Sequence, residues 1–429
     1  GLSAAQAAGT PSSAAGAVTQ NWDFIAGTAL GDLTYTQNDS VSTYRDSSGA
    51  WQAVGAVNTP RFHHDASGTR LGLLFEPPRV NKVNHANFSP AGVGGVVATS
   101  GDGTASVIGD AAALSSATID GAPFTALQNG NAIALTGGTG GTTYRLSVDT
   151  GNTNTHSYRV VIAPQGAGYM GNVKTNDGKG INNFNGTGGI YIEIAEDAVP
   201  ITHTTRYLAI YVTAGSTVHL IGAQFEEGTT LTTPILTSGS AGTTQRARPQ
   251  LFDTAANTRP WFDAQNLSLS ARFLPFDDAS ADSQYAFILQ SGTDYQNALG
   301  QRISAPRGHA VPDARAANTA YLTNDLHRPI PGKSFAAAVS LQGGTSVTAL
   351  AGSGRYEMAA LGSAPAGLTR LDLGSRPYTQ TLHGCLQYVR AANISKTFSQ
   401  MGAEMLGHET YKSLIVGGQS NGAYYFRAA

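Results

Sequence analysis

Apolar and polar residues alternate with a period of two along many short stretches of the chain. Residues 189–196 read GIYIEIAE, and residues 207–214 read YLAIYVTA. This period places successive side chains on opposite faces of a β-strand, so one face of each stretch is apolar. Turn signals such as Gly343-Gly344 separate the stretches, and the pattern predicts an all-β chain of antiparallel sandwiches. Comparable stretches are residues 144–148, 158–162, 216–224, 267–274, 334–341 and 369–373.

Only one stretch has a convincing helical period. Ile394, Phe398, Met401 and Met405 recur every three or four residues, and Ser395 lies at their start as a candidate N-cap. We therefore expect one short helix over residues 395–406. The 52 glycines argue against longer helices, because each costs about 1 kcal/mol relative to alanine inside a helix.

Proline and small polar residues divide the chain. Pro77-Pro78 marks the end of an N-terminal β-rich element, because proline removes a hydrogen-bond donor from a strand. Residues 237–249 read TSGSAGTTQRARP, which predicts a break between two sandwiches. Residues 1–18 mix Ala with Gly, Ser, Thr and Pro, so we expect a flexible or partner-ordered arm there. The predicted segments are 1–83, 84–240, 241–406 and 407–429.

Charge and cysteine content exclude several classes of protein. The chain carries 26 Lys and Arg against 28 Asp and Glu, a net charge of −2. Nucleic-acid-binding proteins need clustered cations, because counterion release supplies much of their affinity, so we expect no nucleic-acid partner. No apolar run approaches the roughly 18 residues of a membrane-spanning helix, so we expect no membrane partner. Cys385 is the single cysteine, which leaves no intrachain disulfide and no cysteine-based metal cluster.

Residues 34–84 carry three ordered sequence elements. A Thr-Tyr-x-Asp-x-x-Gly turn is followed by an Asn-x-Pro-Arg-Phe-x-x-Asp element and then by a Gly-Leu-Leu-x-Glu-x-x-Arg-x-Asn strand. This order resembles a segment that recurs in structural proteins of tailed bacteriophages. The sequence departs from that pattern at His63-His64 and at Pro77-Pro78. The matching residues are Thr43, Tyr44, Asp46, Gly49, Asn58, Pro60, Arg61, Phe62, Asp65, Gly72, Leu73, Leu74, Glu76, Arg79 and Asn81.

Two later segments also resemble known modules. Residues 220–237, with Thr244 and Arg246, look like the last strand of jelly rolls from the same phage proteins, which are similar to carbohydrate-binding jelly rolls. Residues 383–405 resemble the closing strand and short helix of concanavalin-like and laminin-G-like sandwiches. These likenesses imply a jelly roll at 84–240 and a concanavalin-like sandwich at 241–406.

Together, the resemblances imply a spike or tail fibre on the exterior of a phage or a gene-transfer particle. Such an appendage would recognise host surface polysaccharide and would contact other virion proteins through its N-terminal region. They also imply a homo-oligomer, either a trimer or, at a capsid vertex, a pentamer. A secreted bacterial adhesin or carbohydrate-binding module unconnected with a virus is an alternative interpretation.

A possible nucleophile lies near the end of the sequence. Residues 414–421 read LIVGGQSN, and the block from Gly418 resembles the first block of SGNH-type carbohydrate esterases, which implies Ser420 as nucleophile. A serine hydroxyl needs a positioned base, and the Asp and His of the family's last block do not follow Ser420 within these residues. We therefore expect no catalysis by this chain. The alternatives are a targeting stem of a longer polysaccharide O-acetylesterase and a chance match in a Gly-rich strand.

Sugar recognition uses aromatic rings that stack on pyranose rings and polar side chains that bind hydroxyls. Residues 166–189 form a long polar run, which predicts a binding loop or a subunit contact. Every candidate residue has an alternative role in a core or an interface. The candidates for carbohydrate binding are Tyr169, Asn182, Asn183, Asn185, Trp261, Tyr285 and Tyr295.

Acidic and histidine residues give two candidate metal sites. Asp277, Asp278 and Asp282 could contribute to a Ca²⁺ site, although they lack the spacing of an EF-hand loop and a solvated turn is the alternative. His63 and His64 point to opposite faces of a strand, which leaves too few ligands for zinc or manganese. We therefore expect no resident metal or cofactor apart from the calcium alternative.

Overall fold

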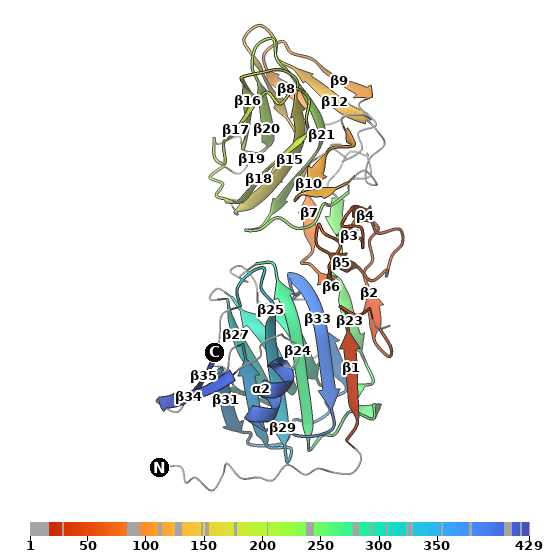
Figure 1. The fold of residues 1–429 in the computed structure, drawn as a ribbon, viewed down its shortest axis with the longest axis vertical. Helices are drawn as coiled ribbons and strands as arrows, with labels where there is room; N and C mark the ends of the chain where they lie inside the picture. Colours follow the sequence, from red (N-terminus) through yellow and green to blue (C-terminus); the bar gives the residue numbers. More distant parts are fainter. Residues whose placement is uncertain are drawn as a thin grey trace. The chain divides into compact units, whose positions relative to one another are not determined.

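The computed structural model divides the chain into two compact units (Figure 1). We call Gln37–Arg70 with Pro78–Arg248 sandwich A, and Gly1–Thr36 with Leu71–Pro77 and Pro249–Ala429 sandwich B. The predicted arm at residues 1–18 lies outside the described residues except for its last two. The structure describes residues 17–27, 30–83, 93, 96–109, 114–124, 131–146, 149–150, 154–175, 178–203, 205–236, 244–277, 283–292, 295–305, 308–322, 326, 329–352, 355–376, 380–406, 414–420 and 423–428.

Sandwich A is built from two five-stranded antiparallel sheets. In order across the first sheet, the strands are β18 (Ile192–Val199), β15 (His156–Pro164), β21 (Thr217–Glu227), β12 (Asn131–Thr136) and β9 (Ala105–Gly109). In order across the second, they are β17 (Asn182–Asn185), β16 (Tyr169–Thr175), β20 (Leu208–Val212), β13 (Thr142–Arg145) and β8 (Val97–Ser100).

The main core of sandwich A contains residues from both sheets. Val160 and Leu220 from the first sheet and Val173 and Ile210 from the second are fully buried. Burying a side chain of this kind stabilises the fold by about 1.5–3 kcal/mol. The apolar positions of the predicted strands therefore hold the two sheets together.

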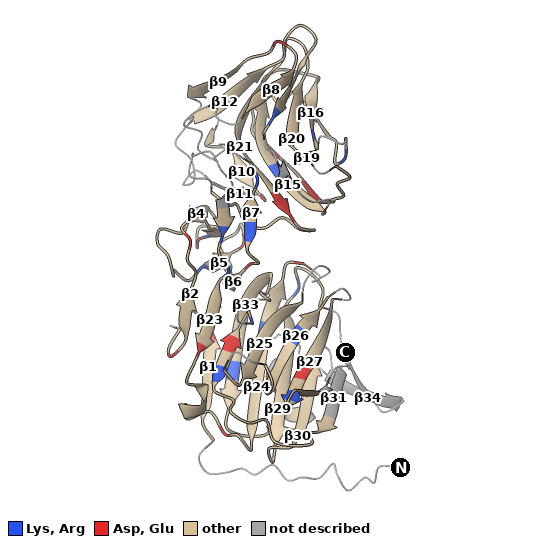
Figure 2. Cartoon of the chain, turned by 180° about the vertical axis from the view of Figure 1, so that it is seen from behind, with Lys and Arg blue, Asp and Glu red and all other residues tan. Residues whose placement is uncertain are grey.

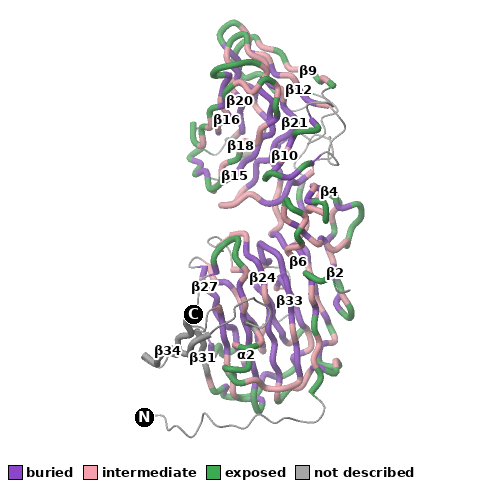
Figure 3. Tube along the Cα trace, in the orientation of Figure 1, coloured by how far each residue is buried: buried purple, intermediate pink, exposed green. Residues whose placement is uncertain are grey.

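The first sheet is also covered on its opposite face. Val161 and Ile221 pack there against Trp51 and Phe124. As a result, all nine residues of β15 are buried. A strand covered on both faces reads as a nearly continuous apolar run, as VVIA does within β15. The second sheet has the alternating burial of a strand layer with one open face (Figure 3).

Short strands complete sandwich A, and all of them except β5 form two-stranded pairs. The β3–β4 hairpin carries Trp51 into the second core. The short strands are β3 (Thr43–Arg45), β4 (Trp51–Ala53), β5 (Phe62–His64), β7 (Arg79–Asn81), β10 (Thr118–Ile119), β11 (Ala122–Pro123), β14 (Asp149–Thr150), β19 (Thr205–Arg206) and β22 (Thr244–Arg246).

Sandwich B contains two larger antiparallel sheets. The strands that this unit contributes to one sheet have the order β31 (Arg355–Ala360), β30 (Ser346–Ala351), β29 (Phe335–Gln342), β24 (Leu267–Pro275), β33 (Gly384–Ala392) and β6 (Arg70–Phe75), and β1 (Thr19–Asp23) also pairs with β33. The other has the order β2 (Thr34–Thr36), β23 (Gln250–Asp253), β32 (Arg370–Leu373), β25 (Gln284–Gln290), β26 (Ala298–Ser304), β27 (His309–Ala316) and β28 (Thr319–Leu322). A short 3₁₀ helix, η3 (Ala256–Thr258), and a terminal hairpin, β34 (Leu414–Ser420) with β35 (Ala423–Ala428), complete the unit.

The predicted helix is present as α2 (Phe398–Leu406) and packs on β24, β29 and β30. Met401 contacts Ala338 and Leu350, which explains the apolar period. The predicted cap at Ser395 is wrong. The N-cap is Thr397, whose Oγ1 accepts from Gln400 N at 3.3 Å while Gln400 Oε1 accepts from Thr397 N at 2.8 Å, a reciprocal capping box. No helix in the described ranges is long and apolar enough to cross a membrane.

The all-β architecture with antiparallel sandwiches is confirmed. The chain passes from one unit to the other after Thr36, Arg70, Pro77 and Arg248, and the last two of these positions lie next to Pro78 and Pro249. The segment 1–83, expected as one element, is divided between the units. Its first strands pair within the sheets of sandwich B, whereas Gln37–Arg70 packs with sandwich A.

Candidate functional site

One face of the β17–β16–β20–β13–β8 sheet carries partly or fully exposed polar and aromatic side chains. Strand register places Asn183, Asn172, Tyr211 and Thr143 in one row across four strands, because each pairs directly with the next. A second row holds Lys174, Ala209 and Arg145, and Tyr169 pairs with Asn185 beside the first row. We call this surface the outer face of sandwich A. Its members are Tyr169, Asn172, Lys174, Asn183, Asn185, Tyr211, Thr143 and Arg145.

Tyr169 is the most prominent ring on the outer face. Its exposed fraction is 50%, and Asn172 Nδ2 donates to its hydroxyl at 3.0 Å. The register shifts between Tyr169 and Gly171, where the strand contains a bulge. A Cβ at Gly171 would lie 1.9 Å from the Tyr211 carbonyl oxygen, so only glycine fits this close approach. The bulge therefore sets the position of Tyr169 at the strand end.

Tyr211 is half-buried at the centre of the same face. Its ring lies against the turn before β13, where a Cβ at Gly141 would come within 2.4 Å of the Tyr211 hydroxyl. Gly141 also has a φ of +81°, which favours glycine. Because Gly141 has no side chain, the turn before β13 leaves room for the Tyr211 ring. Sequence reasoning did not identify Tyr211, Asn172 or Lys174, although the alternation at residues 207–214 already placed Tyr211 opposite the apolar face.

The outer face has positive but no negative side chains among its members. Lys174 and Arg145 contribute the two charges, and the amides of Asn172, Asn183 and Asn185 are both donors and acceptors. Elsewhere, charged residues are scattered over the described strands of each unit (Figure 2). The face is chemically suited to a neutral or acidic ligand that offers hydroxyl groups.

The sequence predicted a loop at residues 166–189. The structure instead has mainly the β16–β17 hairpin there. Its strands bring Tyr169 and Asn185 together as a pair, with Asn183 on the same side. Asn182 instead faces the core. Its Nδ2 donates to the Tyr158 hydroxyl at 2.7 Å and to Glu196 Oε2 at 2.9 Å. Burial raises the pKa of Tyr158 to about 12, so Asn182 partners a neutral buried phenol.

Two of the three candidates in sandwich B, Trp261 and Tyr285, are buried, and Tyr295 is half-buried. Trp261 is 3% exposed and meets Trp22 edge-on, with ring centroids 6.1 Å apart. Tyr285 is 1% exposed, and its hydroxyl lies 2.8 Å from that of Tyr295. The structure thus brings Tyr285 and Tyr295 together, although ten positions separate them. Neither buried ring offers a face for stacking on a sugar.

The metal candidates are placed as follows. Asp277 accepts hydrogen bonds from His383 Nδ1, at 2.8 Å, and from Gln284, whereas Asp278 and Asp282 lie outside the described residues. His63 Nδ1 accepts from Arg45 N at 3.1 Å, and His64 Nδ1 donates to Arg45 O at 3.0 Å. The two imidazoles therefore order a turn. Within the described part of the chain, no three His, Cys, Asp or Glu residues could hold a metal ion.

Ser420 ends β34 and pairs with Ala423 in the terminal antiparallel hairpin. Gly418 lies beside the register shift of this hairpin, between Gly417 and Gln419. The nucleophilic role of Ser420 stays a prediction.

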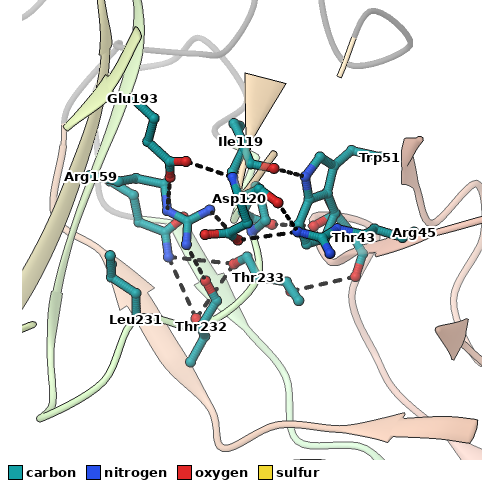
Figure 4. A network of polar contacts seen from close by, with 12 residues as sticks. Thr43, Arg45, Trp51, Ile119, Asp120, Arg159, Glu193, Leu231, Thr232 and Thr233 are labelled. Atoms are coloured by element: carbon teal, nitrogen blue, oxygen red, sulfur yellow. Dashed lines mark hydrogen bonds and ion pairs between the residues drawn. The ribbon is translucent and has the colours of Figure 1, made fainter. Parts of the chain in front are cut away.

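A polar network centred on the buried Arg159 links the β3–β4 hairpin to the first sheet of sandwich A (Figure 4). Arg159, 3% exposed, lies 3.7 Å from Glu193 Oε1 and 3.5 Å from Asp120 Oδ2. Arg45 reaches the same aspartate at 3.7 Å and covers the Trp51 ring at 4.7 Å. Burial raises the pKa of Glu193, and the charge of Arg159 opposes that shift. Two cations and two carboxylates balance here, and their contacts join β3, β15 and β18 within sandwich A.

Comparison with known proteins gives fold likenesses only. No family model matches the sequence, and no curated protein matches it. Domain 4 of AbnA, an extracellular arabinanase from Geobacillus stearothermophilus in complex with arabinotriose, is 13% identical over 42% of this chain and 82% of that chain, with a TM-score of 0.30.

Two further solved structures have comparable scores. The CBM40 domain of the Ruminococcus gnavus IT-sialidase is 10% identical over 33% of this chain and 83% of that chain, with a TM-score of 0.28. The Trypanosoma rangeli sialidase is 10% identical over 65% of this chain and 51% of that chain, with a TM-score of 0.30. Such scores identify neither a family nor a function for this chain.

Proposed function

We propose that the outer face of sandwich A binds polysaccharide. The observation that carries this proposal is Tyr169, a half-exposed ring held by Asn172 beside the amides of Asn183 and Asn185. An aromatic ring of this kind packs on the apolar C–H face of a pyranose, and neighbouring amides bind its hydroxyls. An open sheet face suits an extended chain better than a small molecule, which binds in a concave pocket.

The test is glycan binding by the full chain and two variants. Tyr169→Ala should weaken binding of a recognised oligosaccharide about tenfold, which corresponds to ~1.4 kcal/mol. Val107→Ala removes exposed apolar surface from β9 of the first sheet, where Val107 is 39% exposed, and should leave the affinity unchanged. Equal affinities for Tyr169→Ala and the unchanged chain would exclude the outer face as the site.

We further propose that the chain belongs to a spike or fibre of a phage or phage-like particle and that its ligand is a host surface polysaccharide. The resemblance of residues 34–84 to phage structural proteins supports this assignment. The elements that carry it are structured: Asp46 and Asp65 each order a turn, and Arg61 is fully buried and donates to Thr43 O at 3.2 Å.

Particle location and oligomeric state provide the second test. Antibody labelling in electron microscopy should place the chain on the exterior of particles, and light scattering should give a homo-oligomer, with a trimer expected and a pentamer for a vertex protein. A monomer in solution, together with unlabelled particles, would count against the appendage and leave the carbohydrate-binding proposal to its own test.

A further inference from the structure

A cationic cluster lies on sandwich B and shares no residue with the outer face of sandwich A. Its centre is Asp313 on β27, which is 3% exposed. Arg315 Nε donates to Asp313 Oδ1 at 3.1 Å, Arg302 Nε lies 3.9 Å from Oδ2, and Tyr285 donates to Oδ2 at 2.9 Å. One carboxylate thus anchors this array.

Tyr295 carries two guanidinium groups. Arg315 lies 4.3 Å and Arg376 3.8 Å from the centre of its ring. Its hydroxyl lies 2.8 Å from that of Tyr285, which in turn donates to the buried Asp313 carboxylate. The ring is therefore occupied by cations and positions them, rather than stacking on a sugar as the sequence suggested.

The positive charge of the three arginines exceeds the negative charge of the single carboxylate near them. Asp313 is the acidic partner that the described residues supply to Arg302 and Arg315, and Arg376 makes no side-chain hydrogen bond or ion pair with a described residue. Arg302 Nε is shielded from solvent and has no hydrogen-bond partner in the described chain. Burial also raises the pKa of Asp313, against the effect of Tyr285 and Arg315. Three guanidiniums around one carboxylate leave unmatched positive charge.

Part of this charge is accessible to a ligand. The side chains of Arg302 and Arg315 are 29% and 24% exposed, and Arg376 and Tyr295 are half-buried. Guanidinium groups are planar forks that bind carboxylate or sulfate through paired hydrogen bonds. Because Asp313 and the Tyr295 ring already position Arg315, and Tyr295 positions Arg376, these two side chains would lose little freedom on binding.

We infer that Arg302, Arg315 and Arg376 form a second binding site, specific for the anionic group of an acidic sugar. The choice of a sugar rests on the proposed function, whereas the site itself rests on the arrangement of these three arginines around Asp313 and Tyr295. Carboxylate and sulfate share the required chemistry. The site would add selectivity for acidic polysaccharide to the less charge-dependent outer face.

The test compares binding of an oligogalacturonate, its methyl ester and a sulfated galactan oligomer to the full chain by calorimetry. The acidic oligomer of the correct type should bind about tenfold more tightly than the ester, with affinity that falls as salt rises. Binding of only the uronate identifies a carboxylate, and binding of only the sulfated oligomer identifies a sulfate. Equal affinity for both acidic oligomers and the ester would overturn the inference.

Variants separate this site from the rest of the chain. Arg376→Gln should weaken acidic-oligomer binding about tenfold, Arg376→Lys should recover part of it because charge returns without the fork, and Lys333→Gln should have no effect. Lys333 is an exposed cation of the same unit and serves as the matched control. Equal binding by Arg376→Gln and Lys333→Gln would overturn the site. Tyr169→Ala should leave the preference for acid over ester intact. A failure of the outer-face proposal can therefore be distinguished from a failure of the arginine site.

Discussion

Gly49 and Gly68 occupy equivalent positions in two turns that lie against each other. A Cβ at Gly49 would lie 2.3 Å from Ala66 O, and a Cβ at Gly68 would lie 2.3 Å from Ser47 O. Both residues also have positive φ, +79° and +84°. The two Asp-x-Ser-Gly sequences, from Asp46 and from Asp65, therefore form a reciprocal pair of turns. The absence of a side chain at each glycine allows the backbone of the other turn to approach closely.

Alanine at either glycine should destabilise sandwich A. Gly49→Ala introduces a side chain that collides with backbone and also requires left-handed φ, so we expect a loss of about 2–4 kcal/mol in the free energy of unfolding. Urea unfolding monitored by tryptophan fluorescence gives this value. The control is Gly55→Ala, since nothing lies within 4 Å of the added Cβ, and its effect should be small. Similar losses for the two variants would contradict the reciprocal packing.

Asp65 should make sandwich A sensitive to acid. The Ser67 hydroxyl and then the Thr69 N–H donate to its carboxylate and lower the pKa of Asp65 from its ordinary 3.8. A carboxylate with a lowered folded-state pKa stabilises the protein above pH 3.8, and this contribution is lost as pH falls through the folded-state pKa. The advantage of the unchanged chain over Asp65→Asn should therefore be full near neutral pH and shrink in acid.

Unfolding free energies measured from about pH 6 down to about pH 2.5 test this prediction. Ser67→Ala is the second variant, because it removes the hydroxyl that contributes most to the shift and keeps the carboxylate. It should show a smaller pH dependence than the unchanged chain. A stability difference between Asp65→Asn and the unchanged chain that stays constant over the whole range would refute the assignment.

The capping box of α2 gives a direct comparison between the structure and the sequence. Thr397→Ala removes the hydroxyl that accepts from Gln400 N, so we expect a loss of about 1 kcal/mol in the stability of sandwich B. Ser395→Ala alters the residue that the helical period alone suggested, and should be nearly neutral. Thermal unfolding of the two variants measures the difference. A larger loss of stability for Ser395→Ala than for Thr397→Ala would support Ser395 as the N-cap and contradict the capping box at Thr397.

The sequence predicted the strands and the helix face, which depend on the local period of apolar residues. The stretches at 207–214 and 216–224 form β20 and β21, and Met401 faces the sheet that its helical period required. The cap was misplaced by two residues because several small polar residues precede α2 and only backbone geometry selects one. The β16–β17 hairpin was missed because glycine and asparagine interrupt the alternation, although Val173 and Phe184 still supply its buried side.

The candidate sites depended on contacts between distant residues, which no local pattern reveals. Asn182 and Asn183 are neighbours with the same side chain, and register alone turns one to the core and the other to the outer face. Tyr285 and Tyr295 were identified as aromatic residues near polar loops. Their joint role with Asp313 and Arg376 required the pairing of β25, β26 and β27.

Arg159 should be the most sensitive member of the network in Figure 4. Arg159→Met keeps much of the side-chain volume but leaves Glu193 in a buried position with less positive charge, so we expect a loss of about 3–5 kcal/mol. Arg145→Met is the matched control, because Arg145 is a partly exposed arginine of the same unit, and it should change stability by less than about 1 kcal/mol.

A second substitution distinguishes loss of charge balance from loss of packing. If the uncompensated carboxylate causes the damage, Glu193→Gln added to Arg159→Met should recover part of the lost stability, because the amide carries no charge. Acid should have the same effect on Arg159→Met. Burial raises the pKa of Glu193, so its ionisation destabilises the fold as pH rises above the ordinary value of 4.5, and the loss of Arg159 enlarges this penalty. Urea unfolding of the single and double variants near pH 5 and pH 7 measures both effects. A double variant no more stable than Arg159→Met, with the same deficit at both pH values, would show that Arg159 acts through packing alone.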